Sequence, residues 1–224
     1  MQPNTTLAEL AVLHPGAARV FFHHRLDFCC GGRRPLEEAC RERGLDAAAI
    51  LREIDAAKPL AGDLPRWDVQ PRQALIDYIV STYHERLRRD LPDLIEMARR
   101  VEGKHGDKPG CPRGLTAHLE TMHLAVLDHL LKEEQILFPM IRRGVGSSAA
   151  GPVQVMEMEH DHHREDLLQL RTLTDDFSPP AHACATWRAL YAGLLQLEQE
   201  LMEHIHLENN VLFPRAAALE NSGR

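Results

Sequence analysis

Hydrophobic positions with a helical period dominate the chain from about residue 68 to its end. Apolar residues recur at alternating steps of three and four over four segments, roughly 68–102, 114–142, 152–174 and 183–213. This spacing places the apolar side chains in a seam along one face of each segment, as in helices that pack in a bundle. No alternating β pattern of useful length is present. We therefore predict an all-α protein in which residues 68–224 form an up-down-up-down four-helix bundle.

The first 60 residues carry a different pattern, made of short helical pieces divided by turn signals. The most distinctive of these signals is Cys29-Cys30-Gly31-Gly32. Two prolines and a glycine follow between Lys58 and Pro65, where no helical pattern continues. We predict a small N-terminal helical domain over residues 1–60 and a linker over residues 61–67.

Breaker residues predict where the bundle helices stop. Small and Ser-rich residues from Gly144 to Pro152 predict a connection, since they follow a helix and lack the Gly-Lys-Ser/Thr ending of a phosphate loop. Pro139 and Pro214 fall inside helical patterns, where proline removes an N–H group and crowds the preceding turn. We expect each of these two prolines to kink or end its helix.

Polar residues interrupt the apolar seams. The seam of the second segment passes through His129 and Glu133 and continues to Ile136, and that of the fourth segment passes through His204 and Glu208. A carboxylate among apolar side chains costs roughly several kcal/mol unless it is paired, hydrogen-bonded or bound to a metal. Two such carboxylates in equivalent places predict a bound cation.

An internal repeat relates these residues. A His-x-x-x-Glu string followed by Phe-Pro occurs at positions 129, 133 and 139 and again, at the same offset, at 204, 208 and 214. The first and third segments align on the inward residues His84 and His160. Each half of the repeat thus supplies one His from its first helix and a His-x-x-x-Glu from its second. The His and the Glu of this string lie on one helix face, because they are four residues apart. We predict that six side chains converge on one core: His84, His129, Glu133, His160, His204 and Glu208.

The number and type of these side chains predict a dinuclear metal site. Two bridging Glu and four His give each of two ions two imidazole nitrogens and two carboxylate oxygens, and a shared oxo or hydroxo group adds a fifth ligand. This set suits octahedral iron better than tetrahedral zinc, although zinc and manganese stay open on donor type alone. We predict two iron ions with an oxo or hydroxo bridge. The alternative is a metal-free bundle that uses the repeat for packing.

Composition narrows the choice of partners. Asp and Glu (33) outnumber Lys and Arg (26), so the net charge of −7 argues against a nucleic-acid partner. Neither a signal peptide nor an apolar run of about 18 residues is seen, so we expect neither export nor a membrane partner. Five cysteines, two of them adjacent, suit a reducing compartment, and we predict a cytoplasmic protein.

Residues 70–215 resemble the hemerythrin-like domain of the RIC (repair of iron centres) family, and Leu26-Asp27-Phe28-Cys29-Cys30-Gly31-Gly32 resembles the signature of that family's short N-terminal domain. The resemblance implies the same six di-iron ligands. Oxygen-carrying hemerythrins have a fifth histidine one helical turn from another ligand, where this chain has Arg88 and Arg164, so simple oxygen carriage is disfavoured. His163 is expected to be a neighbour of the ligands or an alternative ligand.

The resemblance also implies a function. Members of the family restore iron-sulfur clusters damaged by nitric oxide or oxidative stress, by iron donation or by nitric oxide binding or reduction at the di-iron centre. The implied partners are damaged iron-sulfur proteins and small diatomic ligands such as nitric oxide or oxygen. A second hypothesis is a sensor or storage module that binds oxygen or nitric oxide without turnover. Cys29 and Cys30 distinguish the two, as candidate redox or iron-transfer thiols; the alternative for them is a small buried turn.

Overall fold

The computed structural model describes residues 2–60, 63–144 and 146–218, and all the regular elements within these ranges are helices. The prediction of an all-α protein is confirmed. No helix among the described residues is both long and apolar enough to cross a membrane.

Four short helices form the N-terminal part: α1 (Leu7–Leu13), α2 (Ala17–His23), α3 (Leu36–Glu42) and α4 (Ala47–Ala56). The first begins with a capping box, in which the Thr6 side chain accepts from the Glu9 N–H and the Glu9 carboxylate accepts from the Thr6 N–H. The interior of this part is filled by buried apolar side chains such as Phe21, Phe28 and Leu36.

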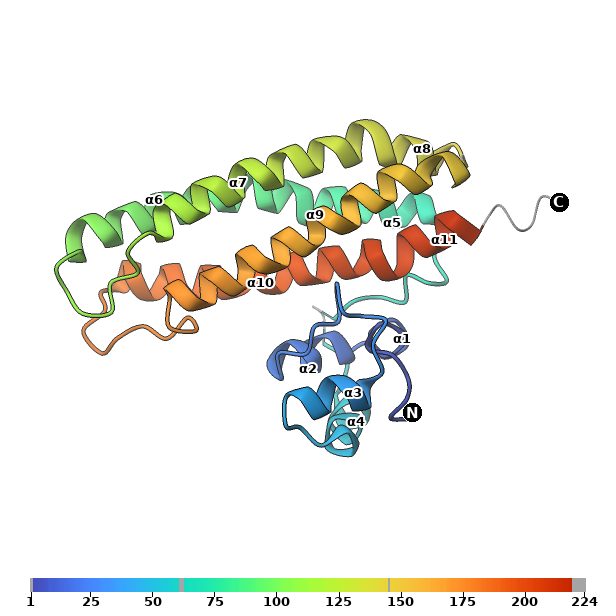
Figure 1. Cartoon of the computed structure of the whole chain (residues 1–224), viewed down its shortest axis with the longest axis horizontal. Coiled ribbons are helices and arrows are strands. Elements are labelled where there is room, and N and C mark those ends of the chain that lie inside the picture. Colours follow the sequence, from blue (N-terminus) through green and yellow to red (C-terminus); the bar gives the residue numbers. More distant parts are fainter. Residues whose placement is uncertain (1, 61–62, 145, 219–224) are drawn as a thin grey trace.

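Four rods make up the rest of the chain. The first contains α5 (Arg72–Ile79), the π-helical turn η1 (Val80–His84) and α6 (Glu85–His105). The second contains α7 (Leu115–Lys132), η2 (Glu133–Leu137) and α8 (Phe138–Arg142). The third is α9 (Gly146–Leu173), and the fourth contains α10 (Ala185–Leu207), η3 (Glu208–Leu212) and α11 (Phe213–Ala217). In Figure 1 successive rods run in opposite directions along the long axis of the molecule.

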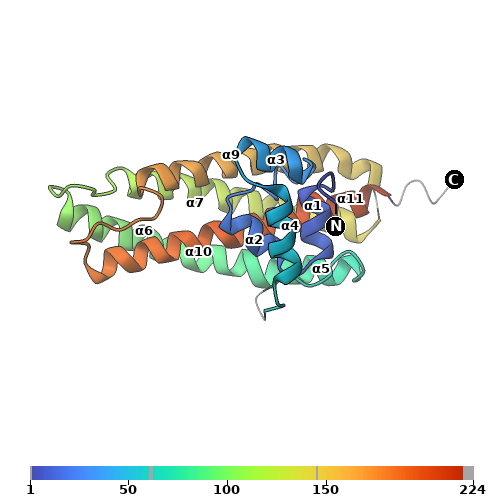
Figure 2. The same ribbon diagram turned by 90° about the horizontal axis from the view of Figure 1, so that it is seen from below.

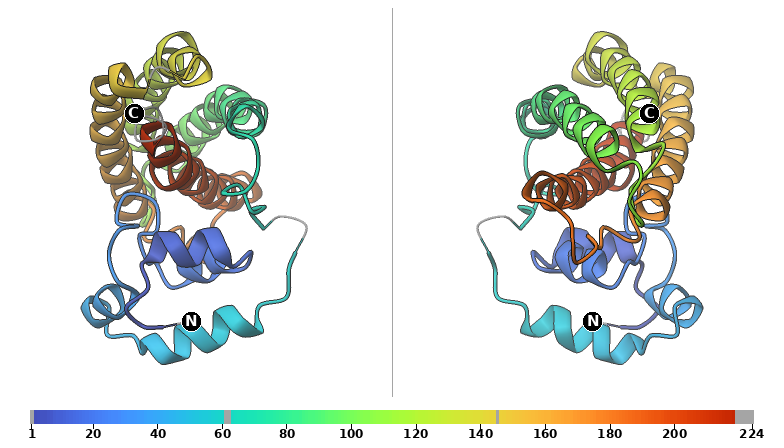
Figure 3. Two further views of the ribbon diagram at one scale, coloured as in Figure 1. Left: turned by 90° about the vertical axis from the view of Figure 1, so that its right-hand side faces the viewer. Right: turned by 90° about the vertical axis from the view of Figure 1, so that its left-hand side faces the viewer.

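Two hydrophobic clusters hold these elements together. One joins the N-terminal helices to the end of the bundle that contains α5, α8 and α11, and it includes Phe28 together with Leu75 and Ile79 of α5. The other fills the opposite half of the bundle around Trp187. Figures 2 and 3 show α1 to α4 lying along one side of the bundle. The N-terminal part is therefore packed against the rods through a shared apolar core.

One prediction about helix ends is wrong, and a second is wrong in part. Residues from Gly146 to Gly151 belong to α9, which continues through Pro152, because Ala149 is buried in the core and holds this segment against the bundle. Pro139 and Pro214 do not end their helices, which continue to Arg142 and Ala217. Each proline stands in the first turn after a π-helical segment, where the wider turn leaves room for its ring.

Three of the four rods contain a π-helical turn next to a predicted ligand. The turn η1 ends at His84, whereas η2 begins at Glu133 and η3 at Glu208. A π-helical turn adds one residue and rotates everything after it relative to an α-helix. Consequently Leu137 is buried while Ile136, predicted to lie in the seam, is 52% exposed. The predicted seam beyond Glu133 is therefore wrong by one residue.

Candidate metal centre

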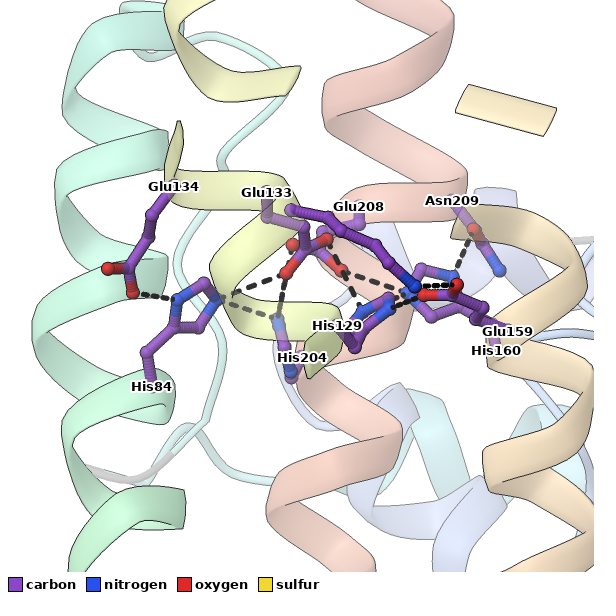
Figure 4. Close-up of polar contacts among 10 residues, drawn as sticks. His84, His129, Glu133, Glu134, Glu159, His160, His204, Glu208 and Asn209 are labelled. Atoms are coloured by element: carbon purple, nitrogen blue, oxygen red, sulfur yellow. Dashed lines mark hydrogen bonds and ion pairs between the residues drawn. The ribbon is translucent and has the colours of Figure 1, made fainter. Parts of the chain in front are cut away.

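All six predicted ligand side chains meet between the rods, as Figure 4 shows. Each is buried, with at most 2% of its surface exposed: His84, His129, Glu133, His160, His204 and Glu208. The two carboxylates face the interior of the bundle and lie within reach of both pairs of histidines. The structure thus places the repeated residues around one centre.

The ligand atoms form two groups that share both carboxylates. Position A comprises His84, His204, Glu133 and Glu208, and position B comprises His129, His160, Glu133 and Glu208. Oε2 of Glu133 lies 3.4 Å from Nε2 of His84, and Oε1 of Glu133 lies 3.4 Å from Nε2 of His129. Glu208 likewise directs its oxygens to the other histidines of positions A and B, at 3.1 and 3.2 Å. Each carboxylate therefore directs one oxygen to a histidine of position A and the other to a histidine of position B.

The spacing and chemistry of the donor atoms suit a bound cation. Among the described residues, no hydrogen-bond donor is correctly aligned with any of the four oxygens of Glu133 and Glu208. The two Nε2 atoms lie only 3.2 Å apart in position A and 3.1 Å apart in position B. Burial, and then the neighbouring Glu208, raise the pKa of the Glu133 carboxyl well above its usual range. Carboxylate oxygens without a donor, and Nε2 atoms that face one another at about 3 Å, fit the donor set of a pair of divalent metal ions.

Two of the four histidines are held by carboxylates on their outer side. Nδ1 of His84 lies 2.7 Å from Glu134, which also accepts from Arg88 at 2.8 Å. Nδ1 of His129 lies 2.9 Å from Glu159, and this contact lowers the pKa of Glu159 to about 2. An ionised carboxylate accepts the Nδ1 proton, so Nε2 of each ring is left free to bind a metal.

The other two histidines, His160 and His204, have no carboxylate of the described residues at Nδ1. In this respect the two halves of the repeat are not symmetric. Nδ1 of His160 lies 2.8 Å from the amide oxygen of Asn209, and the ring of His204 stacks on Tyr83 with centroids 5.7 Å apart. Asn209 and Tyr83 stand at the repeat positions of the two carboxylates. These outer residues were not predicted from the sequence. The repeat nevertheless marks them, since each adjoins a ligand Glu or an inward His in both halves.

His163 lies beside position B but belongs to neither group of ligand atoms. Its ring is buried and meets the ring of His129 edge-on, with centroids 5.0 Å apart. Within the described part of the chain its ring nitrogens have no hydrogen-bond partner. Its role stays a prediction.

The turn Asp27–Gly32, which we call the dithiol loop, packs against the metal centre. Sγ of Cys30 lies 3.6 Å from the backbone carbonyl of His160. The side-chain amide of Asn210, on η3, donates to the carbonyl of Cys29 at 2.9 Å. One π-helical turn therefore presents a ligand to the centre and also holds the loop.

The two thiols of the loop are free and adjacent. Cys29 is buried, Cys30 is partly exposed, and their sulfur atoms lie 3.8 Å apart. The contact with Cys30, together with burial, raises the pKa of the Cys29 thiol well above its usual range. Without a cation nearby, Cys29 therefore stays protonated at neutral pH.

Gly32 allows the dithiol loop to approach η3 closely. A Cβ atom at this position would lie 2.7 Å from both the Asn210 amide and the Phe28 carbonyl. We expect Gly32→Ala to destabilise the protein by about 1–3 kcal/mol, since overpacking forces the loop away from η3. Urea denaturation measures the loss, and faster labelling of Cys29 and Cys30 by a thiol reagent reports the displaced loop.

The control for this change is Gly103→Ala in α6, where a Cβ would meet no atom within 4 Å. There alanine is expected to stabilise by about 0.5–1 kcal/mol through its better helix propensity. Identical labelling rates in Gly32→Ala and in the unmodified protein would contradict the tight docking of the loop.

Comparison with known proteins gives two family matches and a group of close relatives. Residues 75–216 match the hemerythrin HHE cation binding domain, and residues 3–58 match a domain of unknown function, DUF542. The chain is 49% identical over 213 residues to a protein of Yersinia pseudotuberculosis serotype O:1b named iron-sulfur cluster repair protein YtfE, covering 95% of this chain and 96% of that protein. A protein of the same name from Yersinia pestis (strain Pestoides F) is 48% identical with the same coverage.

Proposed function

Because the chain belongs to the family of iron-sulfur cluster repair proteins that carry a hemerythrin HHE cation binding domain, we propose that it repairs iron-sulfur clusters damaged by nitric oxide or oxidative stress. One observation carries this proposal: two pairs of buried histidines share two buried carboxylates whose oxygens have no other partner among the described residues.

We propose that these side chains hold two iron ions, one in position A and one in position B, with Glu133 and Glu208 shared between them. Bound iron supplies redox chemistry and a coordination position for a small ligand such as nitric oxide or oxygen. The oxo or hydroxo bridge stays a prediction.

The protein's own residues prepare this site. Glu134 and Glu159 hold the Nδ1 protons of His84 and His129, so that Nε2 of each ring faces the interior. The fully buried ligands keep water away from the centre. Outside the two positions, the dithiol loop contacts the backbone of His160 and offers two sulfur atoms next to the centre.

We further propose that Cys29 and Cys30 are the redox or iron-transfer thiols of the repair reaction, and that the protein acts in the cytoplasm, where thiols stay reduced. Damaged iron-sulfur proteins would then be its partners, and iron would leave the centre on the side of the dithiol loop. Iron donation and nitric oxide binding or reduction both start from this centre.

The experiment is restoration of a damaged iron-sulfur protein by the iron-loaded chain. With Cys29→Ala and Cys30→Ala together, we expect restoration to fall to the level seen without the protein, while the iron in positions A and B is unchanged. The matched control is Cys111→Ala with Cys184→Ala, since Cys111 precedes α7, Cys184 stands at the start of α10, and neither belongs to a candidate metal group of the described residues. Unchanged restoration in the first variant would refute the role of the loop and favour a sensing or storage module.

A further inference from the structure

We propose that Asp27, Cys29 and Cys30 form a second metal site, which binds a single divalent transition-metal ion through two sulfur atoms and one carboxylate. As a site it stands on the geometry of the dithiol loop alone. Its role as an intermediate binding site for ferrous iron, between the bundle and a recipient protein, rests on the proposed function.

The distances within the loop are those of a shared ion. One ligand atom from each of the three residues lies within 4.8 Å of the others. Two thiolates bound at about 2.3 Å to a tetrahedral ion stand about 3.8 Å apart. The sulfur atoms of Cys29 and Cys30 are 3.8 Å apart, and Oδ1 of Asp27 lies 3.2 Å from Sγ of Cys29. An ion can therefore be bound with little movement of the backbone.

The glycines that follow bring the carboxylate to the thiols. A Cβ at Gly31 would lie 2.8 Å from the Asp27 carbonyl and 3.2 Å from its carboxyl group. The Asp27 carboxylate also accepts from the Cys30 N–H at 3.0 Å, which fixes it on the sulfur side of the turn. Packing explains a buried side chain at Cys29, but it does not require a second, partly exposed sulfur beside it.

A small cavity gives access to the two thiols. Its volume is about 50 Å³, which exceeds the space that one water molecule needs. Glu157 and Asp161 from α9 line it, together with Asn209, the residue that accepts from the ring of His160. The cavity thus offers further oxygen donors and adjoins the outer side of position B.

The charges of the site can be balanced in part. When a divalent ion binds, both thiols release their protons to solvent, and the two thiolates and one carboxylate exceed the charge of the ion by one. Glu157 and Asp161 add negative charge to the cavity, and two arginines offset part of the total. Arg33 lines the same cavity, and Nε of Arg164 lies 4.0 Å from Oδ2 of Asp27.

The test uses the full chain with its bundle centre loaded with iron and reduced, titrated with Co²⁺ without oxygen. Sulfur-to-cobalt charge-transfer absorption requires thiolate ligands, which the His and Glu centre does not contain. We expect this absorption to saturate at one cobalt per chain, and X-ray absorption to find two sulfur neighbours. Absence of the band would overturn the proposal.

Three variants identify the ligands. Cys29→Ser and Cys30→Ser should each abolish the two-sulfur signal. Asp27→Asn keeps an oxygen that can accept from the Cys30 N–H but removes the charge, and it should weaken cobalt binding at least about tenfold. The control is Cys40→Ser, because Cys40 is buried in α3 and belongs to no candidate metal group of the described residues. A band that survives both loop serines would overturn the site.

Failure here is distinct from failure of the proposed function. Iron content and the absorption of the bundle centre are measured on the same samples before cobalt is added. A loaded bundle without a cobalt–sulfur band would leave the repair proposal standing and remove the second site. A cobalt–sulfur band in a chain that restores no damaged cluster would keep the second site and remove the repair proposal.

Discussion

Replacing Glu133 or Glu208 by leucine is expected to abolish the metal centre while the helices remain. Each carboxylate serves both positions, so one substitution removes a ligand from two ions at once. Leucine has a similar volume and suits the apolar surroundings, and the far half of the bundle keeps its own core around Trp187. Metal analysis should find iron lost from both positions, and circular dichroism should find the helical content retained.

The same two variants should change stability in opposite directions with and without metal. Metal at a thousand times its Kd stabilises the unmodified protein by about 4 kcal/mol, and the variants cannot gain this. Without metal they should be at least as stable as the unmodified chain, because each substitution removes buried carboxyl oxygens that have no hydrogen-bond donor among the described residues. Denaturation of loaded and metal-free samples measures both effects.

Glu165→Leu, at an exposed position of α9, is the control for these variants and should leave iron content unchanged. Retention of two iron ions by either Glu133→Leu or Glu208→Leu would show that the carboxylates are not bridging ligands. Global unfolding of the metal-free variants would show that they are needed for packing instead.

Removal of Arg171 is expected to cost about 3–5 kcal/mol, because it leaves a buried charge without its partner. Glu198, on α10, is 4% exposed and accepts from Nε of Arg171 at 2.6 Å. Burial raises the pKa of Glu198, and the contact with Arg171 opposes that rise. Arg171→Met should therefore show a lower free energy of unfolding in urea at neutral pH.

This loss should shrink as the pH falls. Without Arg171, the pKa of Glu198 in the folded state is still higher above its value in the unfolded chain. As the pH falls, the folded state therefore takes up a proton at Glu198 before the unfolded chain does. The loss of stability is complete above the folded-state pKa of Glu198 and disappears as the pH falls through that pKa to the ordinary Glu value of about 4.3. A loss of stability that does not depend on pH would contradict an ionic origin.

Two further variants check the size of the effect. Arg171→Met combined with Glu198→Leu should recover most of the stability, since an apolar pair can replace a buried ion pair. Arg99→Met, which breaks an exposed contact with Glu120, should change the free energy of unfolding by only about 0.2–1 kcal/mol. A comparable loss in Arg99→Met would mean that burial does not set the penalty.

The sequence predicted that the six side chains of the candidate metal centre converge between the rods because its repeat supplies the same local geometry twice. His and Glu four residues apart share a helix face wherever the helix lies, and the apolar seam shows which face is inward. The helix ends and the seam beyond Glu133 were predicted less well. A run of apolar residues after Glu133 is compatible with either an α-helical or a π-helical turn, so Ile136 could not be told from Leu137.

By itself, then, the amino-acid sequence determined the helical class and the identity of the two acids and four histidines that meet between the rods, since both depend on spacing within single helices. The tertiary structure alone decided which oxygen faces which ring, and that Glu159 supports His129 from another helix. It also decided that Asn210 holds the dithiol loop beside the centre. These contacts join segments far apart in the chain, and no local period encodes the distance between them.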